Sequence, residues 1–373
     1  MRWEMVKFLD VVKDITGGNK KFPNSDYSEK GAIPIIDQGD GLIGGYTDSD
    51  EIVKREKPVV VFGDHTKALK YVDFDFCLGA DGVKVLQPNE KLDSKFLYYY
   101  LGSIQLPNVG YSRHFKFLKE IEIPLPPLKT QQRIAEILDK ADALRRKDQA
   151  LLKKYDELAQ AIFIDMFGDP VKNEMGWEKK RLGDSIKKVQ IGPFGTQLHE
   201  SDYILDGIPV INPMHIGDLK IKPNYKYSIS KEKYDELDQY HLSVGDVILA
   251  RRGEMGRCAI VGEKEKGFLC GTGSLFISVD KNKLEPLFLV YVLSRKSSKI
   301  ALENASAGTT MSNLNKNIVN EFKVILPNIE KQRAFVKAIK ISEHNIDLTN
   351  QLLSNSNTLF QSLLQQAFQE ELV

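Results

Sequence analysis

The chain of 373 residues repeats itself, and this tandem duplication constrains its fold more than any other feature of the sequence. Its only two tryptophans lie in matching segments, Met1-Arg-Trp-Glu4 and Met175-Gly-Trp-Glu178, at an offset of 174 residues. Three further pairs of similar segments follow in the same order along the chain: Ile33–Ile36 with Ile208–Ile211, Phe96–Leu101 with Phe288–Leu293, and Leu125–Gln131 with Leu326–Gln332. Because similar segments in a fixed order indicate repeated structural units, we predict two similar halves.

Each half begins with a strand-rich part. The segments Lys57–Phe62 and Gly245–Ala250 are short and apolar, which is typical of buried strands. The repeated segments Phe96–Leu101 and Phe288–Leu293 could form either helix or strand, because short apolar runs do not distinguish the two.

Each half ends with a long segment that contains no proline or glycine and follows a proline-rich entry, as is typical of a helix. We therefore predict two similar mixed α/β domains at residues 1–128 and 169–327. We predict two long helices at residues 129–168 and 328–373. The predicted fold class is α+β, with two domains separated by two long antiparallel helices that form a coiled-coil spacer and with an internal pseudo-two-fold duplication.

A heptad pattern runs along both predicted helices. In the first helix, one series of residues seven apart is Ile137, Leu144, Leu151 and Leu158, and a second is Ile134, Ala141, Asp148, Tyr155 and Ile162. In the second helix the series is Ile339, Ile346, Leu353 and Phe360, with the polar residues Ser342, Thr349 and Ser356 between them. Two such seams in one chain favour packing of the helices against each other. The alternative is that each helix packs only on its own domain.

Charge and composition exclude several classes of protein. Lys and Arg number 52 and Asp and Glu number 51, so the net charge of +1 excludes a polycation but permits local basic faces. The three cysteines form no C-x-x-C pair and the six histidines are scattered, so we predict no metal site. No apolar run reaches the ~18 residues that span a bilayer, and we expect a cytoplasmic protein that does not contact membranes.

Sequence motifs for catalysis are absent. The chain has no G-x-x-x-x-G-K-[ST] motif, no H-E-x-x-H motif and no Asn/Asp-Pro-Pro-Tyr/Phe motif. The segment Gly271–Ser274 is glycine-rich but is better explained as a turn than as a phosphate-binding loop. We therefore predict no catalytic residues and no bound cofactor. These absences favour a binding or scaffolding protein.

Polar and basic loops at equivalent places in the two halves are candidates for contact with nucleic acid, because their residue types bind phosphate and base edges. Ordinary turns or capping loops are the alternative for each. In the first half the candidate residues are Thr16, Asn19, Lys20, Lys21, His65, Lys67, Arg113, His114 and Lys116. In the second half they are Thr196, Gln197, Arg251, Arg252, Arg257, Thr309, Thr310, Asn313 and Lys316.

The sequence resembles the specificity subunits of type I restriction-modification enzymes over nearly its whole length. The resemblance rests on Trp3 and Trp177, on the entry Ile123-Pro-Leu-Pro-Pro-Leu-Lys-Thr-Gln-Gln-Arg-Ile134, on Asp165-Met-Phe-Gly-Asp-Pro170, and on the second entry Ile325-Leu-Pro-Asn-Ile-Glu-Lys-Gln-Arg333. It implies two target-recognition domains that each bind one half of a split double-stranded DNA sequence.

The resemblance further implies that the helices set the gap between the half-sites and dock two modification subunits, which methylate adenine with S-adenosylmethionine. Two restriction subunits would complete the enzyme, with ATP and Mg used only on partner subunits. The specificity subunit itself would have no catalytic residues, in agreement with the missing motifs. The alternative functions are a non-catalytic two-headed scaffold for other partners, or a nuclease or methyltransferase within this chain.

Overall fold

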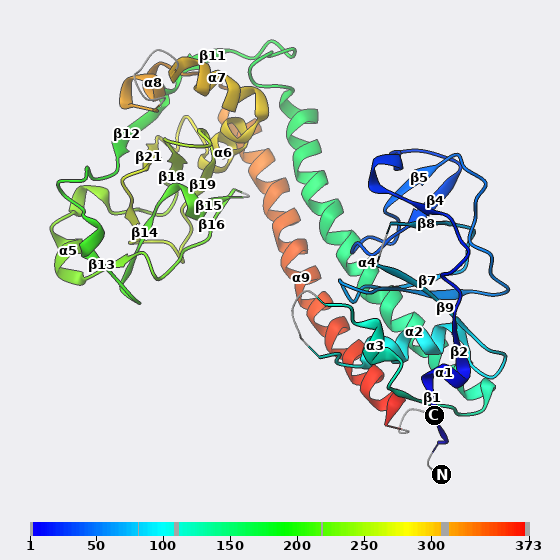
Figure 1. The fold of residues 1–373 in the computed structure, drawn as a ribbon. Coiled ribbons are helices and arrows are strands. Elements are labelled where there is room, and N and C mark those ends of the chain that lie inside the picture. The colour runs from blue at the N-terminus through cyan, green and yellow to red at the C-terminus, as the bar shows by residue number, and fades with distance from the viewer. Residues whose placement is uncertain (1–2, 81, 108–111, 218, 307–312, 370–373) are drawn as a thin grey trace. The chain divides into compact units, whose positions relative to one another are not determined.

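The computed structural model of the chain describes residues 3–80, 82–107, 112–217, 219–306 and 313–369 (Figure 1). It forms two compact units. Unit 1 comprises Met1–Leu151 and Thr349–Val373, and unit 2 comprises Leu152–Leu348. Each unit therefore contains one strand-rich domain and a part of both long helices. Within the described part of the chain, none of the helices combines the length and the apolar character needed to cross a membrane.

Unit 1 is built on two four-stranded sheets. The first is antiparallel in the order β2-β9-β6-β7. Its strands are β2 (Val12–Asp14), β9 (Val83–Pro88), β6 (Val59–Gly63) and β7 (Leu69–Val72). The second has the order β3-β8-β4-β5, with β8 parallel to β3 and β4. Its strands are β3 (Lys21–Phe22), β8 (Cys77–Gly79), β4 (Ile33–Ile36) and β5 (Gly45–Thr47).

Short elements complete unit 1. Strands β1 (Met5–Lys7) and β10 (Glu122–Pro124) form an antiparallel pair at the two ends of the domain. The helices are α1 (Phe8–Val11), α2 (Ser94–Ser103) and α3 (Phe115–Leu118). The apolar strand β6 is buried along its whole length, as the predicted strand at Lys57–Phe62 requires.

Unit 2 repeats this plan. Its antiparallel sheet has the order β12-β21-β18-β19, which matches β2-β9-β6-β7 strand for strand. The strands are β12 (Ile186–Ile191), β21 (Ser274–Val279), β18 (Val247–Ala250) and β19 (Cys258–Ile260). A second set of strands is β13 (Tyr203–Ile204), β17 (Ser228–Ile229), β14 (Ile208–Ile211) and β20 (Leu269–Cys270). The predicted duplication is thus present in the structure.

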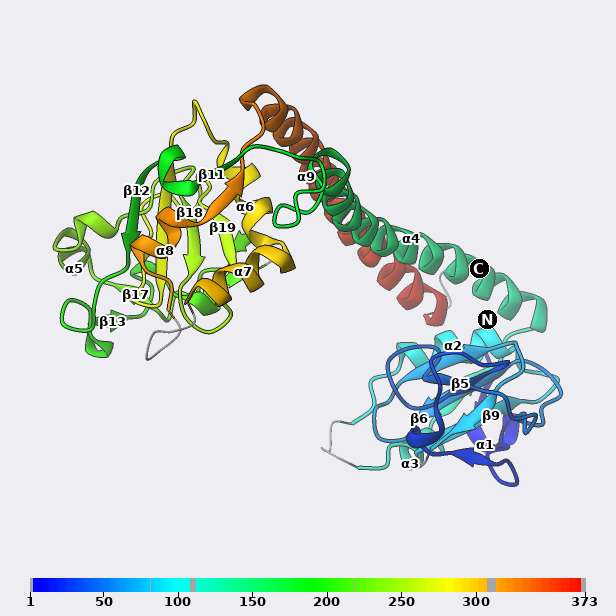
Figure 2. The same ribbon diagram turned by 90° about the horizontal axis from the view of Figure 1, so that it is seen from above.

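The remaining elements of unit 2 are short. They are β11 (Lys179–Arg181) paired with β22 (Lys323–Ile325), β15 (Ile216–Gly217) paired with β16 (Lys220–Ile221), and the helices α5 (Lys231–Asp235), α6 (Pro286–Ser294), α7 (Lys296–Ser306) and α8 (Lys316–Glu321). Helices α6 and α7 contact each other (Figure 2). Short 3-10 helices lie at Asn24–Asp26, Leu182–Ser185, Glu200–Asp202, Pro213–His215 and Asp238–Tyr240.

The segments Phe96–Leu101 and Phe288–Leu293, which the sequence left open, are helical and lie in α2 and α6. Asp93 caps α2, because its carboxylate accepts hydrogen bonds from the backbone of Lys95 and Phe96 at 2.9 Å. Almost every residue of α6 is buried, which explains why its sequence shows no polar face.

The chain contains two helices of 40 residues each, α4 (Leu128–Phe167) and α9 (Ile329–Phe368). In unit 1, Ile134 and Leu138 of α4 share one core with Leu364 near the end of α9. In unit 2, Phe163 near the end of α4 contacts Phe335 near the start of α9, with ring centroids 5.6 Å apart. These pairings are antiparallel, as predicted.

Each long helix also packs on the domain of its unit. Phe368 of α9 contacts Phe96 of α2 at 5.4 Å in unit 1, and Phe167 of α4 contacts Phe288 of α6 at 4.9 Å in unit 2. The helices thus pack against each other as well as on the domains, and the alternative that each packs only on its own domain is wrong.

The predicted heptad seam needs one correction. Leu144 and Leu158 of α4 are 45% and 46% exposed, and Ile137 and Leu151 are only half-buried. The buried positions lie one residue later, at Leu138 and Ala159. In the series that starts at Ile134, the first three residues are buried, and Tyr155 and Ile162 are half-buried. In a helix of 3.6 residues per turn, the positions three and four after a core residue flank it almost equally. Contact with the strand-rich domain buries the position four residues later, such as Leu138.

The seam of α9 contains buried polar residues between apolar ones. Ile339 and Phe360 are buried, Ile346 and Leu353 are half-buried, and Ser342, Thr349 and Ser356 are buried between them. In unit 1, the Ser356 hydroxyl donates a hydrogen bond of 2.7 Å to the Asp148 carboxylate of α4. The single polar interruption in the α4 seam therefore meets a polar partner on α9.

A fully buried glutamine joins domain and helix in unit 1. The Gln131 side-chain amide donates hydrogen bonds to the carbonyl oxygens of Lys91 at 2.9 Å and Pro126 at 2.8 Å. Its oxygen accepts a hydrogen bond of 2.8 Å from the Asp93 amide. Gln131 is 0% exposed, so its bonds are made away from water.

Unit 2 repeats this joint with Gln332, which is also 0% exposed. Its amide donates to the carbonyl oxygens of Lys283 at 3.1 Å and Pro327 at 2.8 Å, and its oxygen accepts from the Glu285 amide at 2.9 Å. Each proline-to-glutamine entry of the sequence is therefore the place where a long helix is fastened to its domain.

Candidate nucleic-acid interface

One edge of the antiparallel sheet in unit 2 gathers the loops that the sequence singled out. Strands β12 and β18 end at this edge, while β21 and β19 begin there. The turn before β21, together with the first residue of that strand, holds the loops together. The Arg251 amide donates to the Gly273 carbonyl and the Gly192 amide donates to the Ser274 carbonyl, both at 3.0 Å. We refer to this edge, with residues 192–197, 251–257 and 271–273, as the unit 2 loop edge.

The segment before α8 joins the unit 2 loop edge. The Leu314 amide donates a hydrogen bond of 3.1 Å to the Arg251 carbonyl, and the Arg251 Nε donates one of 2.9 Å to the Asn313 side-chain oxygen. Of the candidates in this segment, Thr309 and Thr310 lie outside the described residues. Lys316 is exposed at the start of α8.

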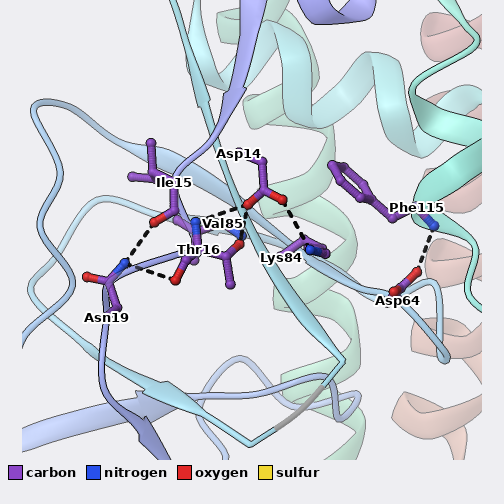
Figure 3. A network of polar contacts seen from close by, with 8 residues as sticks. All are labelled: Asp14, Ile15, Thr16, Asn19, Asp64, Lys84, Val85 and Phe115. Carbon is purple, nitrogen blue, oxygen red and sulfur yellow. Dashed lines mark hydrogen bonds and ion pairs between the residues drawn. The ribbon is translucent and has the colours of Figure 1, made fainter.

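The corresponding edge of unit 1 gathers the loops after β2 and β6, because Gly63 at the end of β6 pairs with Val83 at the start of β9. The segment before α3 joins it: the His114 amide donates to the Asp64 carbonyl at 2.8 Å, and the Phe115 amide donates to the Asp64 carboxylate at 2.7 Å (Figure 3). We refer to this edge, with residues 15–21, 63–68 and 112–116, as the unit 1 loop edge.

Two candidates at the unit 1 loop edge bond within the protein (Figure 3). Thr16 is buried, and its hydroxyl bonds the Asp14 carboxylate and accepts a hydrogen bond of 2.9 Å from the Val85 amide. The Asn19 amide donates to the carbonyls of Ile15 and Thr16, at 2.7 and 3.3 Å. These side chains stabilise the loop, and their contact with DNA stays a prediction.

His114 also contacts the protein itself in unit 1. It is buried, and its Nδ1 lies 3.0 Å from the Asp64 carbonyl oxygen. His65 and Lys67 are half-buried, and Lys67 Nζ donates a hydrogen bond of 3.3 Å to the Pro107 carbonyl. These contacts connect the loop after β6 with the segment before α3.

At the unit 2 loop edge, three candidates hold the loops in place. Gln197 accepts a hydrogen bond of 2.7 Å from the Tyr240 hydroxyl. Arg251 is buried against Asn313, and burial together with the charge of Arg252 lowers the pKa of its guanidinium. The sequence did not distinguish these residues from exposed ones, because the same polar side chains cap turns and bind ligands.

Other candidates are exposed. They are Lys20, Lys21, Arg113 and Lys116 in unit 1, and Thr196, Arg252 and Lys316 in unit 2. Arg257 is half-exposed, and its Nε lies 3.6 Å from the Glu254 carboxylate. Each loop edge therefore presents cations to solvent, although the chain as a whole is almost neutral.

Sequence reasoning missed two features of these edges. Lys84 connects the end of β2 with the start of α3, because its Nζ lies 3.1 Å from the Asp14 carboxylate and 5.0 Å from the centre of the Phe115 ring (Figure 3). No motif signals Lys84, because its partners are distant in sequence. Phe194, in the loop after β12, is 60% exposed, and its position between Pro193 and Gly195 was the only available signal.

Two cavities lie beside the long helices. In unit 2, a cavity of about 600 Å³ is lined by residues that include Tyr291 and Glu343, and burial raises the pKa of Glu343. In unit 1, a cavity of about 440 Å³ contains Tyr71, Tyr99 and Asp139. Burial raises the pKa of Tyr71 to about 12.

The described residues contain no group of three or more His, Cys, Asp or Glu side chains that could hold a metal ion. The three cysteines are buried free thiols, and burial raises the pKa of each. Buried neutral thiols are poor nucleophiles and poor metal ligands.

Comparisons with known proteins match most of the chain. The family model for the type I restriction modification DNA specificity domain matches residues 1–154 and again residues 174–355. The chain is 23% identical over 375 residues to the type I restriction enzyme MjaVIII specificity subunit of Methanocaldococcus jannaschii, covering 93% of this chain and 87% of that protein. It is 25% identical over 409 residues to the type I restriction enzyme EcoBI specificity subunit of Escherichia coli, covering 98% and 85%.

A solved structure has the same fold. The crystal structure of the type I restriction-modification system S subunit from M. genitalium superposes with a TM-score of 0.63. The sequences are 17% identical, and the match covers 99% of this chain and 96% of the other.

Proposed function

Because the chain belongs to the family of type I restriction-modification DNA specificity domains, we propose that its two units read the two halves of a split DNA target. The chain is a specificity subunit, a non-catalytic DNA-recognition component of a restriction-modification system. The observation that carries the proposal is that the same sheet edge is built twice, with different loop residues at each copy.

The side chains at the two edges suit recognition of two different sequences. The unit 1 loop edge offers Lys20, Lys21 and Arg113, whereas the unit 2 loop edge offers Arg252 and Lys316. Cations of this kind bind phosphate, and arginine can also form paired hydrogen bonds with guanine in the major groove. Because the two sets differ, the two half-sites would differ as well.

The long helices would set the gap between the half-sites. A helix of 40 residues is ~60 Å long, at a rise of ~1.5 Å per residue. Half-sites on one face of B-DNA lie ~34–36 Å apart, or a multiple of that distance. A pair of helices of this length, fastened to each domain by a buried glutamine, is suited to act as the ruler.

The same helices would dock the modification subunits. Large apolar side chains are exposed along both: Leu144 and Leu158 on α4, and Ile341, Leu348, Leu352 and Leu359 on α9. Single exposed leucines are ordinary, but a series along one pair of helices is typical of a protein-binding surface. The pseudo-two-fold duplication supports two modification subunits, one for each repeat, and two restriction subunits would complete the enzyme.

The chemistry would belong to these partners. S-adenosylmethionine, ATP and Mg are expected only on the modification and restriction subunits, and none is expected on this chain. We expect the assembly to work in the cytoplasm, where it meets DNA.

A selection experiment tests the proposal. The chain is combined with its modification subunit, and bound duplexes are recovered from a pool of random double-stranded DNA. The proposal predicts two short sequences separated by a gap of constant length. Replacing Arg252 with alanine should change the half-site read by unit 2, and replacing Arg113 should change the other. Failure to enrich any sequence would favour the scaffold alternative.

A further inference from the structure

Two loops that contact the Gly271–Gly273 turn of the unit 2 loop edge each carry an exposed apolar side chain. Phe194 is 60% exposed and Met214 is 63% exposed. Both of their loops touch the turn: a Cβ on Gly192 would lie 1.9 Å from the Gly271 carbonyl oxygen, and a Cβ on Gly273 would lie 2.9 Å from the Pro213 ring. One exposed apolar side chain needs no explanation, but two beside one turn at a recognition edge do.

The loop that carries Phe194 is fixed by hydrogen bonds. The Gln197 amide donates to the Phe194 carbonyl at 2.8 Å, and the Leu198 amide donates to the same oxygen at 3.2 Å. The Phe194 amide donates to the Gln197 side-chain oxygen at 3.3 Å, and the Tyr240 hydroxyl donates to that oxygen at 2.7 Å. Both backbone groups of Phe194 are therefore occupied inside the loop.

The neighbours of Phe194 leave its ring unobstructed. Pro193 is buried, and Gly195 has no atom within 4 Å of the place where a Cβ would stand. The side chain is thus largely exposed on a loop whose backbone is held in place. Its conformation is set before any ligand arrives, so binding would cost little additional ordering.

The surroundings suit nucleic acid. Arg252 is exposed, and the residue before it, Arg251, bonds the Gly271–Gly273 turn. Lys316 is also exposed and lies two residues after Leu314, which bonds Arg251. Cations that can hold phosphate, on the same loop edge as an exposed apolar side chain, are consistent with the way proteins insert phenylalanine or methionine between base pairs.

We propose that Phe194 inserts between neighbouring base pairs of the half-site read by unit 2, with Met214 packed beside it. This inference rests on the proposed function and adds the chemical nature of one contact. The DNA would be locally unstacked at that step, and pyrimidine–purine steps would be favoured because they unstack most easily.

The test uses the complex of this chain with its modification subunit and a duplex that carries both half-sites. Phe194→Ala should weaken specific binding by about fivefold to 150-fold, which corresponds to the roughly 1–3 kcal/mol that the contact of an aromatic ring with a base contributes. Affinity for unrelated DNA should not change, and Phe194→Leu should restore part of the loss. Leu205→Ala, at another exposed apolar residue of unit 2, should have no effect.

A fluorescence measurement separates insertion from a contact in the groove. The analogue 2-aminopurine is moved through the half-site, away from the adenine that is methylated. Its fluorescence should rise at one step with the unchanged chain and not with Phe194→Ala. Equal affinity of Phe194→Ala and the unchanged chain would overturn the inference while leaving the proposed function intact. A weaker affinity without any rise in the unchanged chain would overturn insertion. Absence of sequence-specific binding by the unchanged complex would instead overturn the proposed function.

Discussion

Gln131→Ala is expected to lower the free energy of unfolding of unit 1 by about 2–4 kcal/mol. The substitution removes the side chain that bonds the Lys91 and Pro126 carbonyls and the Asp93 amide. A hydrogen bond contributes roughly 0.5–1.5 kcal/mol net, and an unpaired buried partner costs about 1–3 kcal/mol. The effect should be large because Gln131 is fully buried, so water cannot easily replace it. Asp93 also caps α2, so the start of that helix should loosen.

Urea unfolding followed by circular dichroism measures this change. Gln132→Ala is the matched control, because Gln132 is an exposed neighbour on the same helix and should shift stability by less than about 0.5 kcal/mol. Gln131→Glu should not rescue, since a carboxylate can accept from the Asp93 amide but cannot donate to the two carbonyls. Gln332→Ala should produce the same loss in unit 2. If Gln131→Ala unfolded at the same urea concentration as Gln132→Ala, the joint would not be a source of stability.

Three further substitutions or deletions test the helices. Ser356→Ala should cost about 1.5–3 kcal/mol in thermal or urea unfolding, because the buried Asp148 carboxylate loses its hydroxyl donor; Ser354→Ala, at an exposed residue, is the control. Leu138→Ala should lower the free energy of unfolding by about 2–5 kcal/mol, because Leu138 is fully buried. Leu144→Asp should leave the free energy of unfolding nearly unchanged and weaken co-purification with the modification subunit. Equal destabilisation by the two substitutions would mean that Leu144 belongs to the buried seam after all. Removing one heptad from each long helix shortens the helix by ~10 Å and should shorten the gap between the half-sites by up to about three base pairs. DNA selection measures that gap. An unaltered gap would mean that the helices do not set it.

The repeating features of this fold could be predicted from the sequence, because the spacing of apolar residues along the chain indicates which faces of a helix or strand are buried. The duplication, the strand at Lys57–Phe62 and both long helices are present in the structure. The segment Phe96–Leu101 was ambiguous, because a short apolar run lacks a polar face that would reveal its period. Tertiary packing between the sheet and a long helix resolved it as helix.

The loops could not be assigned in the same way. Thr16, His114 and Arg251 have the residue types of DNA contacts, yet the structure uses them to hold loops together. Whether a polar side chain points inward depends on partners far away in sequence, such as Val85 for Thr16. Phe194 was overlooked for the opposite reason, because sequence patterns treat an isolated aromatic residue as part of the core.

A methylation profile by long-read sequencing tests the central claim most directly. The host would express the modification subunit with this chain, without it, or with the Arg252→Ala variant. The account predicts a split, gapped adenine-methylation motif that disappears without the chain and that changes in only one half with the variant. An unchanged profile in the strain that lacks this chain, with the modification subunit active on other DNA, would contradict the account.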